Sequence, residues 1–193
     1  MKNKRSTSKK LSEMTLEELW QLFPIFLTEH DPSWSEQYDE EASELKKLLP
    51  SGVVFHHIGS TAIDGIMAKP IIDMIVAVDS HERAEEVASI LQAHGYILMS
   101  ASADRISLNK GYTENGFADR VFHLHVRLKN DVDEIYFRDY LNAHPQIAKE
   151  YEALKLSLWK KYEHDRDAYT DAKTEFVKRF TEIAKNDGTI PQK

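Results

Sequence analysis

The stretch 70–78 is apolar throughout except for one carboxylate, Asp73. An apolar run of this length predicts a central strand that is covered on both faces of a sheet. A carboxylate inside such a strand needs a partner, because an unpaired buried charge is costly. That partner can be a metal ion or the neighbouring Lys69. The run therefore predicts an α/β fold with a ligand site centred on Asp73.

A Gly-Ser step, Gly59-Ser60, precedes this strand. Residues 53–58 predict a strand that ends at the step, and the step predicts a turn into a helix. Backbone N–H groups and a hydroxyl at such a turn suit a phosphate. The alternative is an ordinary helix cap, with Asp73 as a hydrogen-bonding residue at a strand end. The carboxylate on the following strand favours the ligand site.

The rest of the chain is organised as a strand-rich middle flanked by helices. Helices are predicted at 15–22, 32–49 and 82–94, strands at 96–99, 105–110 and 121–128, a polar loop at 111–119, and helices from 133 onward. This order predicts a single α/β (α+β) domain at 15–187 that ends in a C-terminal helical pair. A flexible basic tail is expected at 1–14 and a short tail at 188–193.

Composition limits the classes of partner. The chain has 193 residues, a net charge of −7 and no cysteine. The acidic balance does not favour nucleic acid, which requires a basic face, but a local cluster of Lys and Arg can still bind a small anion. The absence of cysteine excludes disulfides and thiolate zinc sites and suits a reducing compartment. No signal peptide or membrane-spanning stretch is predicted, so the expected location is the cytoplasm.

The segments around the two features share a pattern with a known family. Residues 57–62 read His-Ile-Gly-Ser-Thr-Ala, Gly65 follows, and residues 69–73 read Lys-Pro-Ile-Ile-Asp. This pattern resembles the GrpB-like family of predicted nucleotidyltransferase-fold proteins, and it implies a nucleotidyltransferase-like mixed sheet flanked by helices. Further matches cover about residues 25–183 in the same order: Asp31, Pro32, Trp34, Arg120, His123 to Val126, Phe137 to Leu141, His144, Pro145, Tyr151, Lys155, Tyr169, Lys173 and Phe176.

The resemblance implies a specific chemistry. In the nucleotidyltransferase fold the Gly-Ser turn holds a triphosphate, and paired carboxylates on the next strand bind two metal ions. The resemblance thus assigns phosphate contacts to Gly59, Ser60 and Thr61, and catalytic roles to Ser60 and Asp73. A pair of Mg²⁺ or Mn²⁺ ions needs paired oxygen ligands there, because carboxylates must bridge two ions that lie ~3.5–4 Å apart. Strand alternation places residue 75 on the face of Asp73, and this residue is Ile75, so the second carboxylate is absent.

Histidines offer a different set of metal ligands. Alternation along 121–127 places His123 and His125 on one face with Arg127. With His57 nearby, the site would hold Asp73 and several imidazoles, a set that suits a transition metal better than Mg²⁺. The alternative is that the histidines hydrogen-bond a phosphate or each other.

Lysines and tyrosines complete the predicted ligand site. Helical spacing places Tyr151 with Lys155, and Tyr169 with Lys173, on shared helix faces. Such pairs can stack on a base and hold a phosphate, whereas an ordinary amphipathic helix buries Tyr and solvates Lys. With the resemblance, the predicted anion contacts beyond the turn are Lys69, Arg120, Lys155, Tyr169 and Lys173.

Two functions follow as hypotheses. The first is metal-dependent nucleotidyl or phosphoryl transfer, with Asp73 as the metal ligand and a histidine as ligand or base. The second is a non-catalytic module that binds a nucleotide or a coenzyme A precursor, since some proteins of the resembled family are joined to dephospho-CoA kinase. Ile75 favours the second hypothesis, whereas Asp73 and the histidines favour the first. A homodimer is compatible with either hypothesis. A third hypothesis, a purely structural domain, leaves the Gly-Ser turn unexplained.

Overall fold

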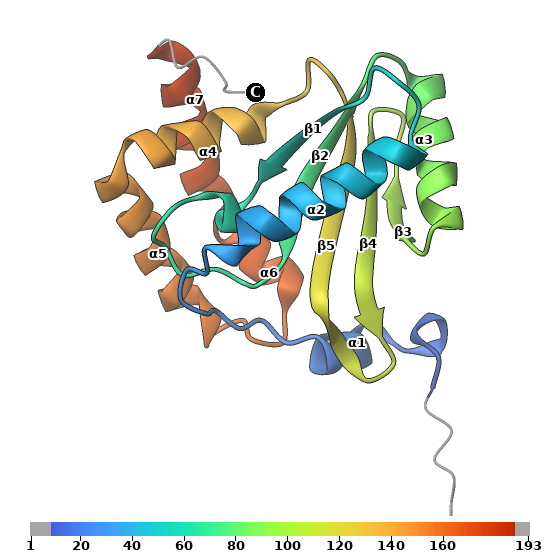
Figure 1. The fold of residues 1–193 in the computed structure, drawn as a ribbon. Helices are drawn as coiled ribbons and strands as arrows, with labels where there is room; N and C mark the ends of the chain where they lie inside the picture. The colour runs from blue at the N-terminus through green and yellow to red at the C-terminus, as the bar shows by residue number, and fades with distance from the viewer. Residues whose placement is uncertain (1–8, 188–193) are drawn as a thin grey trace, which may run out of the picture.

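A five-stranded sheet forms the centre of the molecule (Figure 1). The computed structural model describes residues 9–187. The strand order is β1-β2-β5-β4-β3, with β2 and β5 parallel and the other neighbouring pairs antiparallel. The strands are β1 (Val54–Ile58), β2 (Ile72–Val78), β3 (Ile97–Ala101), β4 (Arg105–Thr113) and β5 (Gly116–Leu128). The predicted mixed α/β architecture is confirmed.

Helices surround this sheet, and none of those in the described part of the chain is long and apolar enough to cross a membrane. They are α1 (Leu16–Leu22), α2 (Ser33–Leu48), α3 (His81–Ala93), α4 (Asp133–Ala143), α5 (Pro145–Trp159), α6 (Arg166–Asp171) and α7 (Thr174–Asn186), with 3₁₀ turns η1 (Leu11–Glu13) and η2 (Ser60–Ala62). The predicted tails fall largely on residues 1–8 and 188–193, which lie outside the described residues. Part of the predicted first tail, however, forms η1.

Strand β2 is central and buried, as its apolar run predicts. It lies between β1 and β5, and Met74 packs on one face with Leu45 of α2 and Val87 of α3. Ile75 points to the opposite face, where Ile135 of α4 covers it. Burying these side chains drives the sheet and the helices together. The opposite face is the one that carries the polar residues of β2 and β5.

A second apolar core joins the C-terminal helices to the loop between β1 and β2. Phe137, Tyr151 and Phe180 of α4, α5 and α7 pack with Ile63 and Ile66 of that loop. The helical C-terminal region is divided more finely than the predicted pair, because the predicted last helix consists of α6 and α7. Lys173 lies at their junction. This packing holds the loop that follows the Gly-Ser turn against α4, α5 and α7.

The predicted polar loop at 111–119 is wrong. Strands β4 and β5 continue through this segment as a hairpin in which Tyr112 pairs with Phe117. A bulge occurs at Gly111, where φ is +91° and a Cβ atom would collide with the Arg120 carbonyl oxygen. The ring of Phe23, just after α1, lies 4.6 Å from that of Tyr112 and 5.0 Å from that of Phe117. Aromatic pairing thus extends the hairpin and places the N-terminal segment beside it.

Candidate functional site

A cavity of about 240 Å³ lies beside β2 and β5, between the turn after β1 and the helices α5 and α6. It brings together residues that are far apart in the sequence and that come from two strands, the helices α5 and α6, and the segments between elements. Its polar lining consists of Ser60, Thr61, Lys69, Asp73, His123, His125, Tyr151, Lys155, Arg166, Tyr169, Thr170 and Lys173, with the backbone of Gly59. Most of the predicted site residues therefore meet here.

Asp73 is the carboxylate of this cavity, and two imidazoles adjoin it. Parallel pairing aligns Asp73 with His123, so both side chains emerge on one face. The Asp73 Oδ1 atom lies 3.1 Å from His123 Nδ1 and 3.7 Å from His125 Nε2. Burial favours the protonated acid, but hydrogen bonding and charge from the imidazoles outweigh it and hold the pKa of Asp73 well below its ordinary value. Asp73 is therefore ionised at neutral pH.

His123 links Asp73 to a tyrosine. Burial lowers the pKa of His123 to about 4, against the opposing effect of Asp73. The neutral imidazole donates from Nδ1 to the carboxylate, which can only accept, and its Nε2 atom accepts from the Tyr112 hydroxyl at 2.8 Å. The tautomer follows from these partners. This chain of hydrogen bonds fixes the orientation of the carboxylate.

Gly59 gives the turn its close approach to Asp73. Its φ is +73°, and a Cβ atom there would collide with the Asp73 carboxylate. The helix predicted after this turn is the short 3₁₀ turn η2, so the macrodipole of a full helix does not contribute here. Burial raises the pKa of the Tyr151 hydroxyl to about 12, and the neighbouring Ser60 side chain opposes this shift. The positive potential of the cavity must therefore come from side chains.

We expect Gly59→Ala to lower the free energy of unfolding by about 2–3 kcal/mol, because left-handed backbone strain adds to the collision with Asp73. Gly65→Ala is the matched control, since its φ is +70° and nothing lies within 4 Å of the added Cβ atom. In the control only the backbone strain acts, so its free energy of unfolding should fall by about 1–2 kcal/mol. Urea unfolding of both variants checks this difference. Equal losses would show that the collision is relieved without cost.

Four cationic side chains surround the cavity: those of Lys69, Lys155, Arg166 and Lys173. Burial, followed by repulsion from the other cations, lowers the pKa of Lys69 and of Lys155 to about 7. Burial also lowers the pKa of Lys173 to about 8, although Asp73 opposes this shift. Lys155 is 1% exposed and donates to the Met67 carbonyl. The predicted alternative of a solvated Lys155 is wrong.

The other three cations of the cavity have no anionic partner in the described part of the chain. Within residues 9–187, the side chains of Lys69, Arg166 and Lys173 form no hydrogen bond or ion pair. Lys69 Nζ and Lys173 Nζ lie 5.6 Å and 4.3 Å from the centre of the Tyr169 ring. The Tyr169 hydroxyl is buried and has no hydrogen-bond partner among the described residues. These groups are donors that a bound anion could satisfy.

Two predicted residues lie elsewhere. His57 pairs with Met74, so its side chain projects to the face opposite Asp73, where its ring stacks on Tyr38 at 4.9 Å. It adjoins the cavity through Thr61, whose Oγ1 atom lies 3.0 Å from His57 Nε2. Strand alternation excludes His57 from a ligand set with Asp73. Arg120 lies on the surface, where it forms an ion pair with Glu40 at 2.5 Å.

Sequence reasoning missed Arg166 and Tyr112. Arg166 stands in a polar turn, Asp165-Arg166-Asp167, that predicts only a helix start. Asp165 caps α6 by accepting from the Ala168 N–H, and the cap places Arg166 in the first turn. Tyr112 falls in the segment that was predicted as a loop. No periodic signal marks either residue as part of the site.

The donor set does not fit a pair of Mg²⁺ or Mn²⁺ ions. The position that would supply the second carboxylate is the fully buried Ile75, and one oxygen of Asp73 already accepts from His123. No group of three or more His, Asp or Glu side chains is arranged to hold a metal ion within residues 9–187. The cationic side chains instead supply positive charge directly. Such a site suits an anionic ligand.

The fold and the site together define an α/β protein in which four cationic side chains surround a single carboxylate on a central strand. The protein belongs to the GrpB family, whose profile, described as GrpB protein, matches residues 24–182. This match agrees with the family resemblance of the sequence motifs.

Similar proteins extend over most of the chain. The UPF0157 protein YqkA of Bacillus subtilis is 35% identical over 81% of this chain, which spans about half of that relative (46%). The glutamate-rich protein GrpB of Alkalihalophilus pseudofirmus is 37% identical over 79% of this chain and 91% of its own length. The crystal structure of GrpB from Enterococcus faecalis has a TM-score of 0.73 at 30% identity, over 84% of this chain and 98% of that one. A dephospho-CoA kinase of Mycolicibacterium paratuberculosis is 28% identical over 78% of this chain and 43% of its own length.

Proposed function

We propose that this protein binds the phosphate group of a small ligand in the cavity beside Asp73, without a metal ion. The observation that carries the proposal is the charge of the lining, in which four cationic side chains face one carboxylate. The chain as a whole has a net charge of −7, so this cluster opposes the overall sign. Lys155 is buried, Lys69 and Lys173 are half-buried, and all three have lowered pKa values, so their positive charges are destabilising unless an anion joins them.

The individual groups have distinct expected roles. Arg166 can bind two phosphate oxygens at once, whereas Lys69 and Lys173 act as point charges. The Tyr169 hydroxyl can donate the hydrogen bond that it lacks among the described residues. Asp73 limits the excess charge in the ligand-free protein. Its repulsion of an anion also favours ligands that contact the lysines rather than the turn.

The ligand classes that this site could accept include nucleotides and coenzyme A precursors. The likeness to a dephospho-CoA kinase supports the second class. Both carry a phosphate ester that the cation cluster can hold. Catalysis by a pair of metal ions lacks support from the donor set, so binding is the proposed activity.

The first test is isothermal titration with methyl phosphate and dephospho-CoA in the presence of EDTA. We expect saturable binding at one site, with no gain when EDTA is replaced by Mg²⁺. Methanol and pantetheine, which lack the phosphate, should not bind. Binding that appears only with Mg²⁺ would overturn the metal-free proposal.

Proton uptake gives a second readout of the same titration. At pH 8 the amines of Lys69 and Lys155, with pKa values of about 7, are largely neutral. An anion beside them raises these pKa values, so binding should take up protons from the buffer. The observed enthalpy should therefore depend on the ionisation enthalpy of the buffer. A buffer-independent enthalpy at pH 8 would show that the lysines do not contact the ligand.

A further inference from the structure

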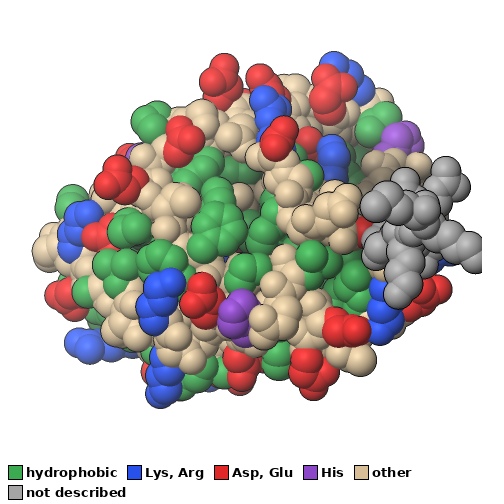
Figure 2. Space-filling model, turned by 90° about the horizontal axis from the view of Figure 1, so that it is seen from below, with side chains coloured by type: hydrophobic (Ala, Val, Ile, Leu, Met, Phe, Trp, Pro, Cys, Tyr) green, Lys and Arg blue, Asp and Glu red, His purple; other side chains and the backbone are tan. Residues whose placement is uncertain are grey.

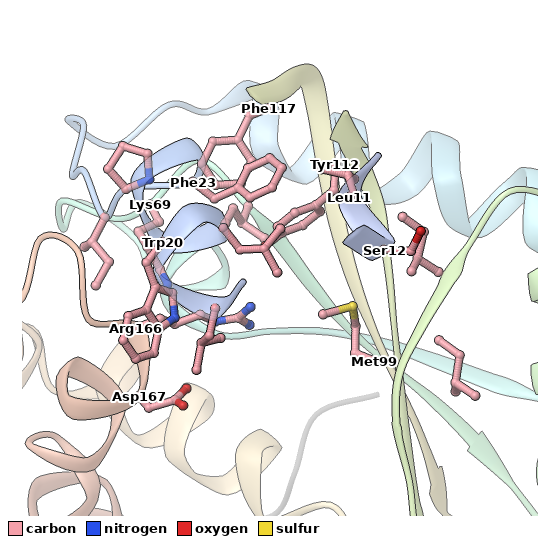
Figure 3. A pocket seen from close by; sticks show the side chains of 17 residues that line it. Leu11, Ser12, Trp20, Phe23, Lys69, Met99, Tyr112, Phe117, Arg166 and Asp167 are labelled. Atoms are coloured by element: carbon pink, nitrogen blue, oxygen red, sulfur yellow. The ribbon is translucent and has the colours of Figure 1, made fainter. Parts of the chain in front are cut away.

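A second, larger cavity adjoins the cationic one. Its volume is about 500 Å³, and it shares Lys69, Ile71 and Arg166 with the first cavity (Figure 3). Because the same three side chains border both spaces, the two cavities lie side by side. The combined size is in the range of small-molecule sites.

The second cavity is mainly apolar. Apart from Ser12, and from Asp167 beside Arg166, its lining away from the shared end is aliphatic and aromatic, as the side chains in Figure 3 show. The main contributors are Leu19, Trp20, Phe23, Leu98, Met99 and Phe117. Figure 2 shows the face seen from below, the end at which α1 lies, where hydrophobic side chains gather around a hollow. Four of the lining side chains are exposed although they are large and apolar: Leu16 and Met99 at 51%, Leu98 at 42% and Ile97 at 41%.

The N-terminal segment builds one wall of this cavity. Six residues of the segment 11–23 line it, and this segment precedes residue 24, where the match to the GrpB family begins. The segment is anchored by the aromatic contacts of Phe23 and by the carbonyl of Trp20, which lies 3.2 Å from His164 Nδ1. The amide of Ile25 donates to the Glu163 carbonyl at 2.7 Å. The apolar cavity therefore depends on a wall that lies outside the family match.

We propose that the second cavity holds the apolar end of the same ligand, so that the protein recognises phosphate esters of a hydrocarbon or aromatic group. This inference rests on the proposed phosphate site. The polar groups of the second cavity lie mainly at the shared end, where Lys69 and Arg166 face the phosphate. The remaining wall offers few hydrogen-bonding partners for the ring nitrogens and amino group of a nucleobase. An alkyl or phenyl group needs none.

The experiment compares methyl phosphate with hexyl phosphate by isothermal titration of the full chain in EDTA. Five additional methylene groups should tighten binding at least about thirtyfold, since each buried methylene is favourable. The heat-capacity change should also become more negative. Adenosine 5′-monophosphate is titrated in parallel as the nucleobase alternative.

Met99→Trp tests the location of the hexyl group. Met99 lies at the β3 bulge, where it has no ladder partner, so the larger side chain can fill the cavity without disturbing strand pairing. The variant should bind hexyl phosphate no better than methyl phosphate and should bind methyl phosphate as the wild type does. Leu156→Trp on α5, at a position that is 39% exposed, is the matched control and should keep the hexyl preference.

The outcomes separate the two proposals. Equal binding of methyl and hexyl phosphate by the wild type would overturn this inference and leave the phosphate site intact. A hexyl preference that survives in Met99→Trp would place the hexyl group elsewhere and would overturn it too. Tighter binding of adenosine 5′-monophosphate than of hexyl phosphate would assign the cavity to a nucleobase. If no phosphate ester binds, both proposals fail.

Discussion

Asp73→Asn should make the ligand-free protein about 2–3 kcal/mol less stable and should bind methyl phosphate about tenfold more tightly. The stability falls because the substitution removes the one carboxylate that lines the cationic cavity, and desolvated charges without a partner are destabilising. The affinity rises because the same carboxylate repels a bound dianion. Urea unfolding with and without methyl phosphate, together with isothermal titration, measures both effects.

This result would distinguish the two hypotheses for the site. If Asp73 held a metal ion that bridges to the phosphate, Asp73→Asn would weaken binding instead of strengthening it. Asp79→Asn is a suitable control, because Asp79 follows β2 directly but is exposed and ion-paired with Lys129 at 2.7 Å. Its effect on stability should stay within about 0.5 kcal/mol.

Lys173→Met should weaken binding of methyl phosphate about 10- to 100-fold while it stabilises the ligand-free protein by about 1–2 kcal/mol. The affinity falls because a charge-assisted hydrogen bond to the phosphate is lost. The stability rises because methionine can pack on the Tyr169 ring without the cost of a half-buried charge that lacks an anionic partner. Such opposite effects are typical of a functional site that is strained when empty.

The pH dependence of stability gives an independent check on Lys173. Its pKa is about 8 in the folded protein, below the ordinary lysine value of 10.5. The unfolded state therefore binds more protons between these values, and the stability of the wild type rises with pH there. Since methionine does not titrate, the advantage of Lys173→Met should shrink as the pH rises from 7 to about 10.

Lys178→Met on α7 serves as the control for Lys173→Met, because its side chain is 70% exposed. It should change neither the affinity nor the pH dependence of stability. Wild-type affinity in Lys173→Met would exclude Lys173 from the phosphate contacts. Loss of stability in that variant would show that its ammonium group already has a stabilising partner.

These predictions follow from how the site differs from a pair of metal ions on paired carboxylates. Ile75 stands where the second carboxylate would be. His123 forms a hydrogen bond with the first, that of Asp73. Lys69 and Arg166 approach from the loop before β2 and from α6. Protein cations thus occupy the surroundings of the strand carboxylate, and an anion can bind to them directly.

Local periodicity was sufficient to predict several parts of this arrangement. The apolar run 70–78 identified a buried central strand, and alternation placed Asp73 opposite the face of Met74. Alternation also placed His123 and His125 on one face of β5. These are properties of neighbouring residues along the chain, so the sequence contains them without knowledge of the fold.

Other parts depended on which distant segments meet. The register that aligns Asp73 with His123, and the pairing that turns His57 to the opposite face, are set by strand contacts. Arg166 reaches the cavity because α6 packs beside the sheet, although its local sequence predicts only a helix start.

The sequence by itself determined the strand that carries Asp73, the Gly-Ser turn and the family pattern around them. Only the tertiary structure decided that Lys155 is buried and that four cations line a cavity with one carboxylate. It also decided that the segment 11–23 contributes one wall of an adjoining apolar cavity. The physical reason is that secondary-structure periodicity is local. The charge and polarity around a side chain depend instead on packing between segments that are far apart in the chain.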